Sequence, residues 1–226
     1  MTSDYFPFSK TQCAVFKGTD RAVFLDKREF AGPIYSQIEN AVDFVLRNIR
    51  LGAMIDGLVR KEKYELPPEA IREMIINAHC HRNLLDESCI QVAVYDDRLE
   101  VTSPGGLYNG LTYEEVMNGH SKIRNKGIAN IFSQMGLVEA WGSGIKRILN
   151  AAEEYGLPKP KFQEFDNMFR VELFRSSFPM TNEKENIGET SEKHRRNIGG
   201  SVENRPQRYT AKDYKVAFRR SSIISS

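Results

Sequence analysis

The sequence predicts an α+β fold in which one layer of strands packs under one layer of helices. Two observations support this prediction. Short segments with alternating apolar residues occur in adjacent pairs, and longer segments with helical apolar spacing lie between them. Adjacent strands favour hairpins, and each intervening helix must bury its apolar side against the sheet, so a two-layer sandwich follows. With 226 residues, the chain can form one such domain with an appendage.

The first region, residues 1–60, contains a predicted hairpin and a predicted helix. Residues 12–30 alternate in polarity on both sides of a turn at Gly18-Thr19-Asp20, which is typical of a hairpin. Gly32-Pro33 then precedes apolar residues at helical spacing, which indicates a helix over about 34–50.

The second region, residues 61–176, carries most of the signal. Pro67-Pro68 opens a helix of about 15 residues, with proline in its favoured first-turn position. One strand is expected on each side of a turn at Asp96-Asp97, and Ser103-Pro-Gly-Gly-Leu107 breaks the second strand. The remaining expected elements are short helices near 112–118 and 128–135, a helix over 145–155, and strands near 161–165 and 169–174.

The third region, residues 177–226, is expected to be a disordered tail. It has few large apolar residues and contains a loose repeat, Asn186-Ile-Gly-Glu and Asn197-Ile-Gly-Gly. Residues 181–226 hold ten Lys and Arg against six Asp and Glu, whereas the rest of the chain holds 22 basic and 24 acidic residues. By charge alone, only the tail is suited to bind nucleic acid.

Composition excludes several classes of protein. No uncharged apolar run approaches the roughly 18 to 20 residues that span a bilayer, and the N-terminus has no basic and apolar leader pattern. The three cysteines, Cys13, Cys80 and Cys89, are an odd number without CxxC spacing. We therefore expect a cytoplasmic protein with reduced thiols and no membrane partner.

The first candidate site is the pair Glu73 and Asn77 on the predicted helix after Pro68. Residues four apart share one helix face. A carboxylate that can activate water, beside an amide oxygen that can hold a divalent cation, suits phosphoryl chemistry. The alternative is a polar helix face with Glu73 in water.

Three further segments could contact a ligand. Gly142-Ser143-Gly144 precedes a helix, whose free N–H groups and dipole favour phosphate. Ser103-Pro-Gly-Gly106 ends a strand, where glycines let a flat ligand approach the backbone. The polar segment 121–125 contains an arginine that could contact phosphate. For the two glycine segments, the alternative is a tight turn without a ligand.

Two other chemistries are excluded on spacing. His79-Cys80-His81 places neighbouring side chains in different directions on a helix, and no second ligand pair follows at zinc spacing. The sequence has no GxxxxGK[ST] motif, so it carries no P-loop nucleotide site and no motor of a helicase.

The order of these motifs resembles one family. Glu73-x-x-x-Asn77-x-x-x-His81-Arg82, then Ser103-Pro-Gly-Gly, then Arg124-Asn125, then Glu139-x-Trp-Gly-Ser-Gly-Ile145 is similar to the GHKL-type, or Bergerat-fold, ATPase domain. That domain occurs in bacterial proteins described as transcriptional regulators or as RecG-like ATP-dependent DNA helicases. The resemblance covers residues 65–175 and implies a mixed sheet under helices.

Parts of the chain outside that region also resemble these regulators. Residues 14–21 and 32–45 resemble the end of the Schlafen/AlbA-type domain that precedes the ATPase in them. The tail resembles their linker, without the winged helix that usually follows. The chain therefore looks like a piece of a longer regulator.

The resemblance implies ATP and Mg²⁺ as cofactors and assigns a role to each motif. Glu73 would be the general base, and Asn77 the Mg²⁺ ligand. The residues implied to contact or cover the nucleotide are His81 and Arg82 near the phosphates, Ser103, Gly105 and Gly106 in the adenine pocket, Gly142, Ser143 and Gly144 over the phosphates, and Arg124 and Asn125 in the lid.

The sequence departs from the family at Thr102-Ser103-Pro104, where well-characterised members have an aspartate that accepts a hydrogen bond from adenine. No lysine-bearing domain follows to complete the phosphate site. Nucleotide binding is therefore favoured over fast turnover, and any enzyme activity is expected to be slow ATP hydrolysis.

Three functions remain open at this point. They are an ATP-binding conformational switch in a DNA-binding transcriptional regulator, a slow ATPase acting on DNA, and a nucleotide-free dimerisation or interaction module. DNA would bind through parts mostly absent from this chain, and a homo-oligomer is expected.

Overall fold

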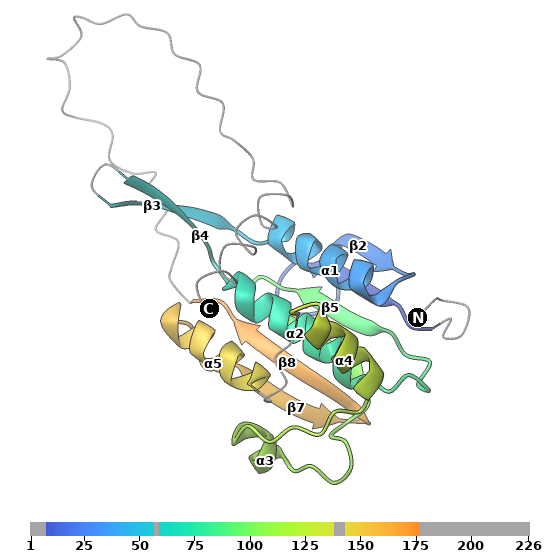
Figure 1. The fold of residues 1–226 in the computed structure, drawn as a ribbon. Helices are drawn as coiled ribbons and strands as arrows, with labels where there is room; N and C mark the ends of the chain where they lie inside the picture. The colour runs from blue at the N-terminus through green and yellow to red at the C-terminus, as the bar shows by residue number, and fades with distance from the viewer. Residues whose placement is uncertain (1–7, 57–58, 138–142, 177–226) are drawn as a thin grey trace, which may run out of the picture. The chain divides into compact units, whose positions relative to one another are not determined.

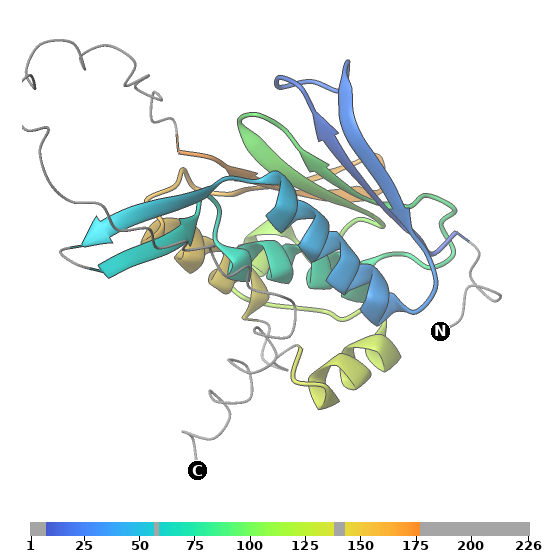
Figure 2. The same ribbon diagram turned by 90° about the horizontal axis from the view of Figure 1, so that it is seen from above.

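The computed structural model describes residues 8–56, 59–137 and 143–176. Within them, a six-stranded mixed sheet is covered on one face by helices (Figures 1 and 2). This confirms the predicted α+β class. The elements in chain order are β1 (Thr11–Phe16), β2 (Phe24–Phe30), α1 (Ile34–Asn48), β3 (Leu51–Asp56), β4 (Val59–Tyr64), α2 (Pro68–His81), β5 (Ile90–Val94), β6 (Arg98–Pro104), α3 (Tyr113–Met117), α4 (Lys126–Gln134), α5 (Gly144–Glu154), β7 (Lys161–Phe165) and β8 (Met168–Phe174).

The strand order is β2-β1-β5-β6-β8-β7. β1 and β5 run parallel, with Thr11 opposite Ile90 and Val15 opposite Val94, and the other neighbours in the sheet are antiparallel. Helices α1, α2 and α5 lie side by side on one face of this sheet, with α2 in the middle (Figure 1). Because α2 is covered on both sides, nine of its 14 residues are buried, including Ile71 and Ile75.

Residues 11–49 belong to the same folded unit as the rest of the sheet. β1 inserts next to β5, and the buried residues of α1 join the core that α2 and β5 form. β1 and α1, which precede the predicted boundary at residue 60, thus pack with elements that follow it, and the boundary itself stays a prediction. The expected tail, residues 177–226, lies outside the described residues.

A buried polar network holds β1, α1 and α2 together. Thr11 Oγ1 lies 3.0 Å from Gln37 Oε1, to which it donates, and 3.2 Å from His79 Nε2. Complete burial lowers the pKa of His79 to about 3, so the ring is neutral. His79 therefore has a packing role. Unlike several other residues of α2, it does not line the cavity described below.

The hairpin β3–β4 forms a separate two-stranded sheet, which the sequence reasoning did not predict. Leu51 pairs with Tyr64 at its base. Lys63 Nζ lies 3.7 Å from the centre of the Tyr155 ring, which links the hairpin to the end of α5.

Candidate functional site

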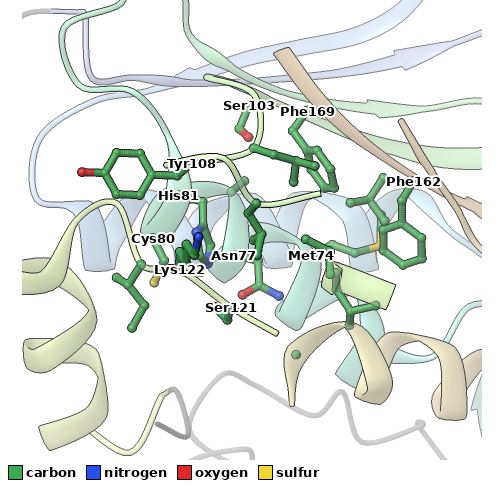
Figure 3. A pocket seen from close by; sticks show the side chains of 18 of the residues that line it. Met74, Asn77, Cys80, His81, Ser103, Tyr108, Ser121, Lys122, Phe162 and Phe169 are labelled. Atoms are coloured by element: carbon green, nitrogen blue, oxygen red, sulfur yellow. The ribbon is translucent and has the colours of Figure 1, made fainter. Parts of the chain in front are cut away.

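A cavity of about 420 Å³ lies between α2, the helix-covered face of β6–β8, α5 and the segment that follows β6 (Figure 3). Its wall on the sheet side is apolar, and its other end is polar. Residues from five segments line it: Glu73, Met74, Asn77, Ala78, Cys80 and His81; Val101 and Ser103; Gly106, Leu107, Tyr108, Leu111, Val116, Gly119, His120, Ser121, Lys122, Ile123 and Ala129; Ser143, Gly144, Ile145 and Ile148; and Phe162, Phe169 and Val171.

Glu73 and Asn77 both line this cavity from α2, on one helix face as their spacing predicts. The helix starts at Pro68, where proline needs no helical hydrogen-bond partner. Asn77 Nδ2 donates to Glu73 Oε1 at 3.1 Å, which leaves the amide oxygen of Asn77 available to a cation.

Glu73 is held in a buried, partly neutralised position. Its exposed fraction is 3%, and Arg147 Nη1 on α5 lies 3.6 Å from Glu73 Oε2. Burial raises the pKa of the Glu73 carboxyl, while the charges of Arg147 and Arg72 act in the opposite direction. A carboxyl with a raised pKa is suited to accept a proton from water, but its contact with Arg147 restrains that role.

The N-terminus of α5 packs directly against the Glu73–Asn77 pair. A Cβ on Gly144 would lie 2.5 Å from Glu73 Oε1 and 2.6 Å from Asn77 Nδ2, so no larger residue fits without displacement. Ser143 precedes the helix, and its side chain makes no capping hydrogen bond. The first-turn N–H groups thus receive no cap from Ser143, and the start of α5 lines the cavity beside Asn77, which is a setting suited to phosphate binding. Gly142, the other predicted residue of this motif, lies outside the described residues.

The two glycines that follow β6, Gly105 and Gly106, have different structural roles. Gly105 has φ +97°, and a Cβ there would lie 3.0 Å from the backbone nitrogen of Asn83. Gly105 thus lets the chain pass close to the end of α2, and it does not line the cavity. Gly106 does line it, and a Cβ there would collide with the Glu164 carboxylate. Ser103 lines the cavity from the end of β6 and is 4% exposed.

Arg124 and Asn125 bind the carbonyl groups at the end of α2. Arg124 Nε donates to the carbonyl of His81 at 3.0 Å, and Asn125 Nδ2 donates to those of Cys80 at 3.1 Å and Arg82 at 2.8 Å. These carbonyls have no partner within the helix, so the two side chains satisfy them. Neither residue lines the cavity. The structure thus assigns them an anchoring role, in place of the expected direct contact with a cofactor.

Arg124 also connects α2 to the segment after β6. Its Nη2 donates to the carbonyl of Gly106 at 2.8 Å, and its guanidinium lies 4.8 Å from the centre of the Tyr108 ring. One side chain therefore fixes the positions of two cavity walls.

His81 and Arg82 point to different places. His81 lines the cavity, and burial together with the charge of Arg124 lowers its pKa, which favours a neutral ring at pH 7. Arg82 is 1% exposed and donates to the carbonyl of Ser88 at 2.9 Å, away from the cavity. The expectation that Arg82 stands near phosphates does not fit this position, because its side chain instead holds the loop before β5.

The sequence reasoning missed several cavity residues. Lys122 Nζ donates to the carbonyl of Asn109 at 3.0 Å and is the cation of fixed charge among the described lining residues. Phe162 and Phe169 contribute aromatic surface from β7 and β8 (Figure 3). No local motif marks Phe162 and Phe169, which the sheet brings to the cavity from a distant part of the chain, whereas Lys122 lies in the segment 121–125, of which the sequence reasoning singled out only the arginine.

The residues present fit Mg²⁺ only together with a phosphate ligand. Among the residues that the structure describes, no group of three or more His, Cys, Asp and Glu side chains is placed to hold a metal. Mg²⁺ characteristically takes one or two protein oxygens and completes its shell with substrate phosphates and water. Asn77 Oδ1 supplies one such oxygen beside the N-terminus of α5, whereas the Glu73 carboxylate is already held by Arg147 and Asn77.

No helix among the described residues is long and apolar enough to cross a membrane.

Comparisons with known proteins agree with this fold. A family model described as "Putative ATP-dependent DNA helicase recG C-terminal" matches residues 87–173, which is less than half of the chain. The match includes Ser103, Gly106 and the start of α5, whereas Glu73 and Asn77 lie upstream of it.

The crystal structure of the DIP2311 protein from Corynebacterium diphtheriae is similar to this fold, with a TM-score of 0.68 and 23% sequence identity. The similarity covers 74% of this chain and 35% of that protein, so this chain corresponds to about a third of its length. No curated protein matches the chain. Residues 87–173 are thus similar to an ATPase-like family.

Proposed function

We propose that the cavity binds ATP with Mg²⁺ and that the chain is the nucleotide-responsive part of a DNA-binding transcriptional regulator. The observation that carries this proposal is the arrangement at the polar end of the cavity. There Glu73 and Asn77 on α2 meet the N-terminus of α5 at Gly144, a residue that must lack a side chain. The similarity of residues 87–173 to an ATPase-like family supports the choice of ATP.

Each end of the cavity suits one part of a nucleotide. The N-terminus of α5, the amide of Asn77 and the ammonium of Lys122 would bind the phosphates and Mg²⁺. The apolar wall, which includes Met74 and Phe169, would pack against the base. Asn77 would hold Mg²⁺, which would supply neutralisation of the phosphate charge.

Binding is favoured over turnover by the position of Glu73. Its carboxylate contacts Arg147 and Asn77, so a water molecule would compete with two existing partners. We therefore prefer a conformational switch to a slow ATPase acting on DNA as the function of this chain. A nucleotide would connect α2, α5 and the segment after β6, and it would shift the population toward conformations in which all three are in contact.

Calorimetric titration with a non-hydrolysable ATP analogue, with and without Mg²⁺, tests this proposal. Asn77→Ala should weaken binding in the presence of Mg²⁺ by about tenfold or more and should have a smaller effect without it. Glu73→Ala should bind the analogue with nearly unchanged affinity. Asn130→Ala is the matched control, because Asn130 is an exposed residue of α4 outside the cavity.

The proposal fails if the unaltered protein does not bind the analogue at millimolar concentration. The chain would then be better described as an interaction module. Equal losses in Asn77→Ala with and without Mg²⁺ would remove Asn77 from the metal site.

A further inference from the structure

Ser103 carries an unpartnered hydroxyl at the apolar end of the cavity. The residue is 4% exposed, yet within the described residues its side chain makes no hydrogen bond to the protein. Its neighbour Thr102 lies on the opposite face of β6, where Thr102 Oγ1 accepts a hydrogen bond from Arg170 at 3.2 Å. Because Ser103 lines the cavity, its hydroxyl is open to that space and available to a ligand.

The surroundings of Ser103 suit a flat aromatic group. Figure 3 shows its hydroxyl directed into the cavity beside Phe169, and Val101 and Val171 line the same wall from β6 and β8. Asn77 lies further along, with its amide directed toward the other end. A base that stacks on the apolar wall would therefore present its edge to a single hydroxyl group.

The carboxylate side chain among the described lining residues lies at the other end of the cavity. Glu73 is the one carboxylate among the described lining residues, and it contacts Arg147, Asn77 and Gly144 at the polar end. A carboxylate could only accept from a base edge, whereas the hydroxyl of Ser103 can rotate and either donate or accept.

We propose that Ser103 reads the base edge of a purine nucleotide without distinguishing a 6-amino from a 6-oxo group, so the site accepts both classes of purine nucleoside triphosphate. The hydroxyl accepts from the amino group of adenine and donates to the carbonyl oxygen of hypoxanthine or guanine. This inference rests on the proposed nucleotide site and specifies its ligand class.

The test compares non-hydrolysable analogues of ATP and ITP, which differ only at the 6-position and the adjacent ring nitrogen. In the presence of Mg²⁺, the unaltered protein should bind the two with dissociation constants within about tenfold, since either base forms one neutral hydrogen bond. Ser103→Ala should weaken both by a similar factor, up to about tenfold. Ser103→Asp should shift preference toward ATP by tenfold or more, because an ionised carboxylate only accepts.

Ser133→Ala is the matched control, because Ser133 is an exposed residue of α4 outside the cavity, and its loss should leave both affinities and the ATP-to-ITP ratio unchanged. Ser103→Thr keeps the hydroxyl and should keep the ratio, which gives a second reading if the aspartate variant does not fold. Preference of the unaltered protein for one nucleotide by more than hundredfold would overturn the inference while leaving the nucleotide site intact. An unchanged affinity in Ser103→Ala would also overturn it. Failure of both analogues to bind would instead refute the proposed function.

Discussion

Replacing Gly144 with alanine should destabilise the protein, whereas the same replacement at Gly127 should not. Both glycines lie in the first turn of a helix, Gly144 in α5 and Gly127 in α4, and neither has a positive φ. A Cβ on Gly127 would meet nothing within 4 Å, but a Cβ on Gly144 would lie 2.5 Å from Glu73 Oε1 and 2.6 Å from Asn77 Nδ2.

The structure sets the size of this effect. The two contacts at Gly144 fall short of an ordinary 3.4 Å contact by about 0.8 to 0.9 Å. Glu73 cannot move away freely, because it is buried and lies between Arg147 and Asn77. Overpacking of this kind costs about 1 to 3 kcal/mol, which would lower Tm by about 2 to 12 °C in a chain of this size. Gly127→Ala should stabilise by up to about 1 kcal/mol, because alanine restricts the unfolded chain.

Thermal and urea unfolding of the two variants beside the unaltered protein would measure this difference. We expect Gly144→Ala also to weaken binding of the ATP analogue, whereas Gly127→Ala should bind it normally. If Gly144→Ala were as stable as Gly127→Ala, α5 would not pack on the Glu73–Asn77 pair, and the geometry proposed for the polar end would be wrong.

Three further predictions follow from the cavity and its supports. Lys122→Met should weaken binding of the ATP analogue by about tenfold but affect adenosine little, and Lys126→Met, outside the cavity, should change neither titration. Arg124→Lys should lower the free energy of unfolding in urea by about 1 to 2 kcal/mol, because lysine lacks the planar fork that places Nε at the carbonyl of His81 and Nη2 at the carbonyl of Gly106. An unchanged midpoint would contradict the anchoring role. Burial raises the pKa of Glu73 above its ordinary value of 4.5, so ionisation of the carboxyl lowers the stability of the folded protein as the pH rises above 4.5. Glu73→Gln should remove this loss and stabilise the protein at pH 7. Urea titrations at several pH values would measure the gain, and no gain would contradict the raised pKa.

The helix of the candidate site could be predicted because its signals are local. Pro68 marks the start of α2, and the four-residue spacing places Glu73 and Asn77 on one face whatever surrounds them. The strands β5 and β6 were predicted for the same reason, since Asp96-Asp97 separates two apolar alternations.

The hairpin β3–β4 was missed, although a local signal exists. Asp56-Gly57 is a common hairpin dipeptide, and alternating apolar residues precede it. Four consecutive charged residues, Arg60, Lys61, Glu62 and Lys63, obscure the alternation in β4.

The roles of Arg82, Arg124 and Asn125 could not be predicted from order in the sequence. Their partners are backbone carbonyls, which every residue has, so the residue type of the partner gives no signal in the sequence. For Arg124 and Asn125, those partners also lie at least 18 residues away. Long-range strand pairing likewise brings Phe162 and Phe169 to the cavity wall.

Hydrogen–deuterium exchange of the full chain, with and without a non-hydrolysable ATP analogue and Mg²⁺, tests the central claim most directly, because it identifies where the ligand binds. The account predicts slower exchange in peptides that cover residues 73–81, 103–111 and 119–123 and the first turn of α5, with no change in α1, which does not line the cavity. Unchanged exchange in all four segments at saturating analogue, or protection confined to α1 and β2, would contradict the assignment of this cavity as a nucleotide site.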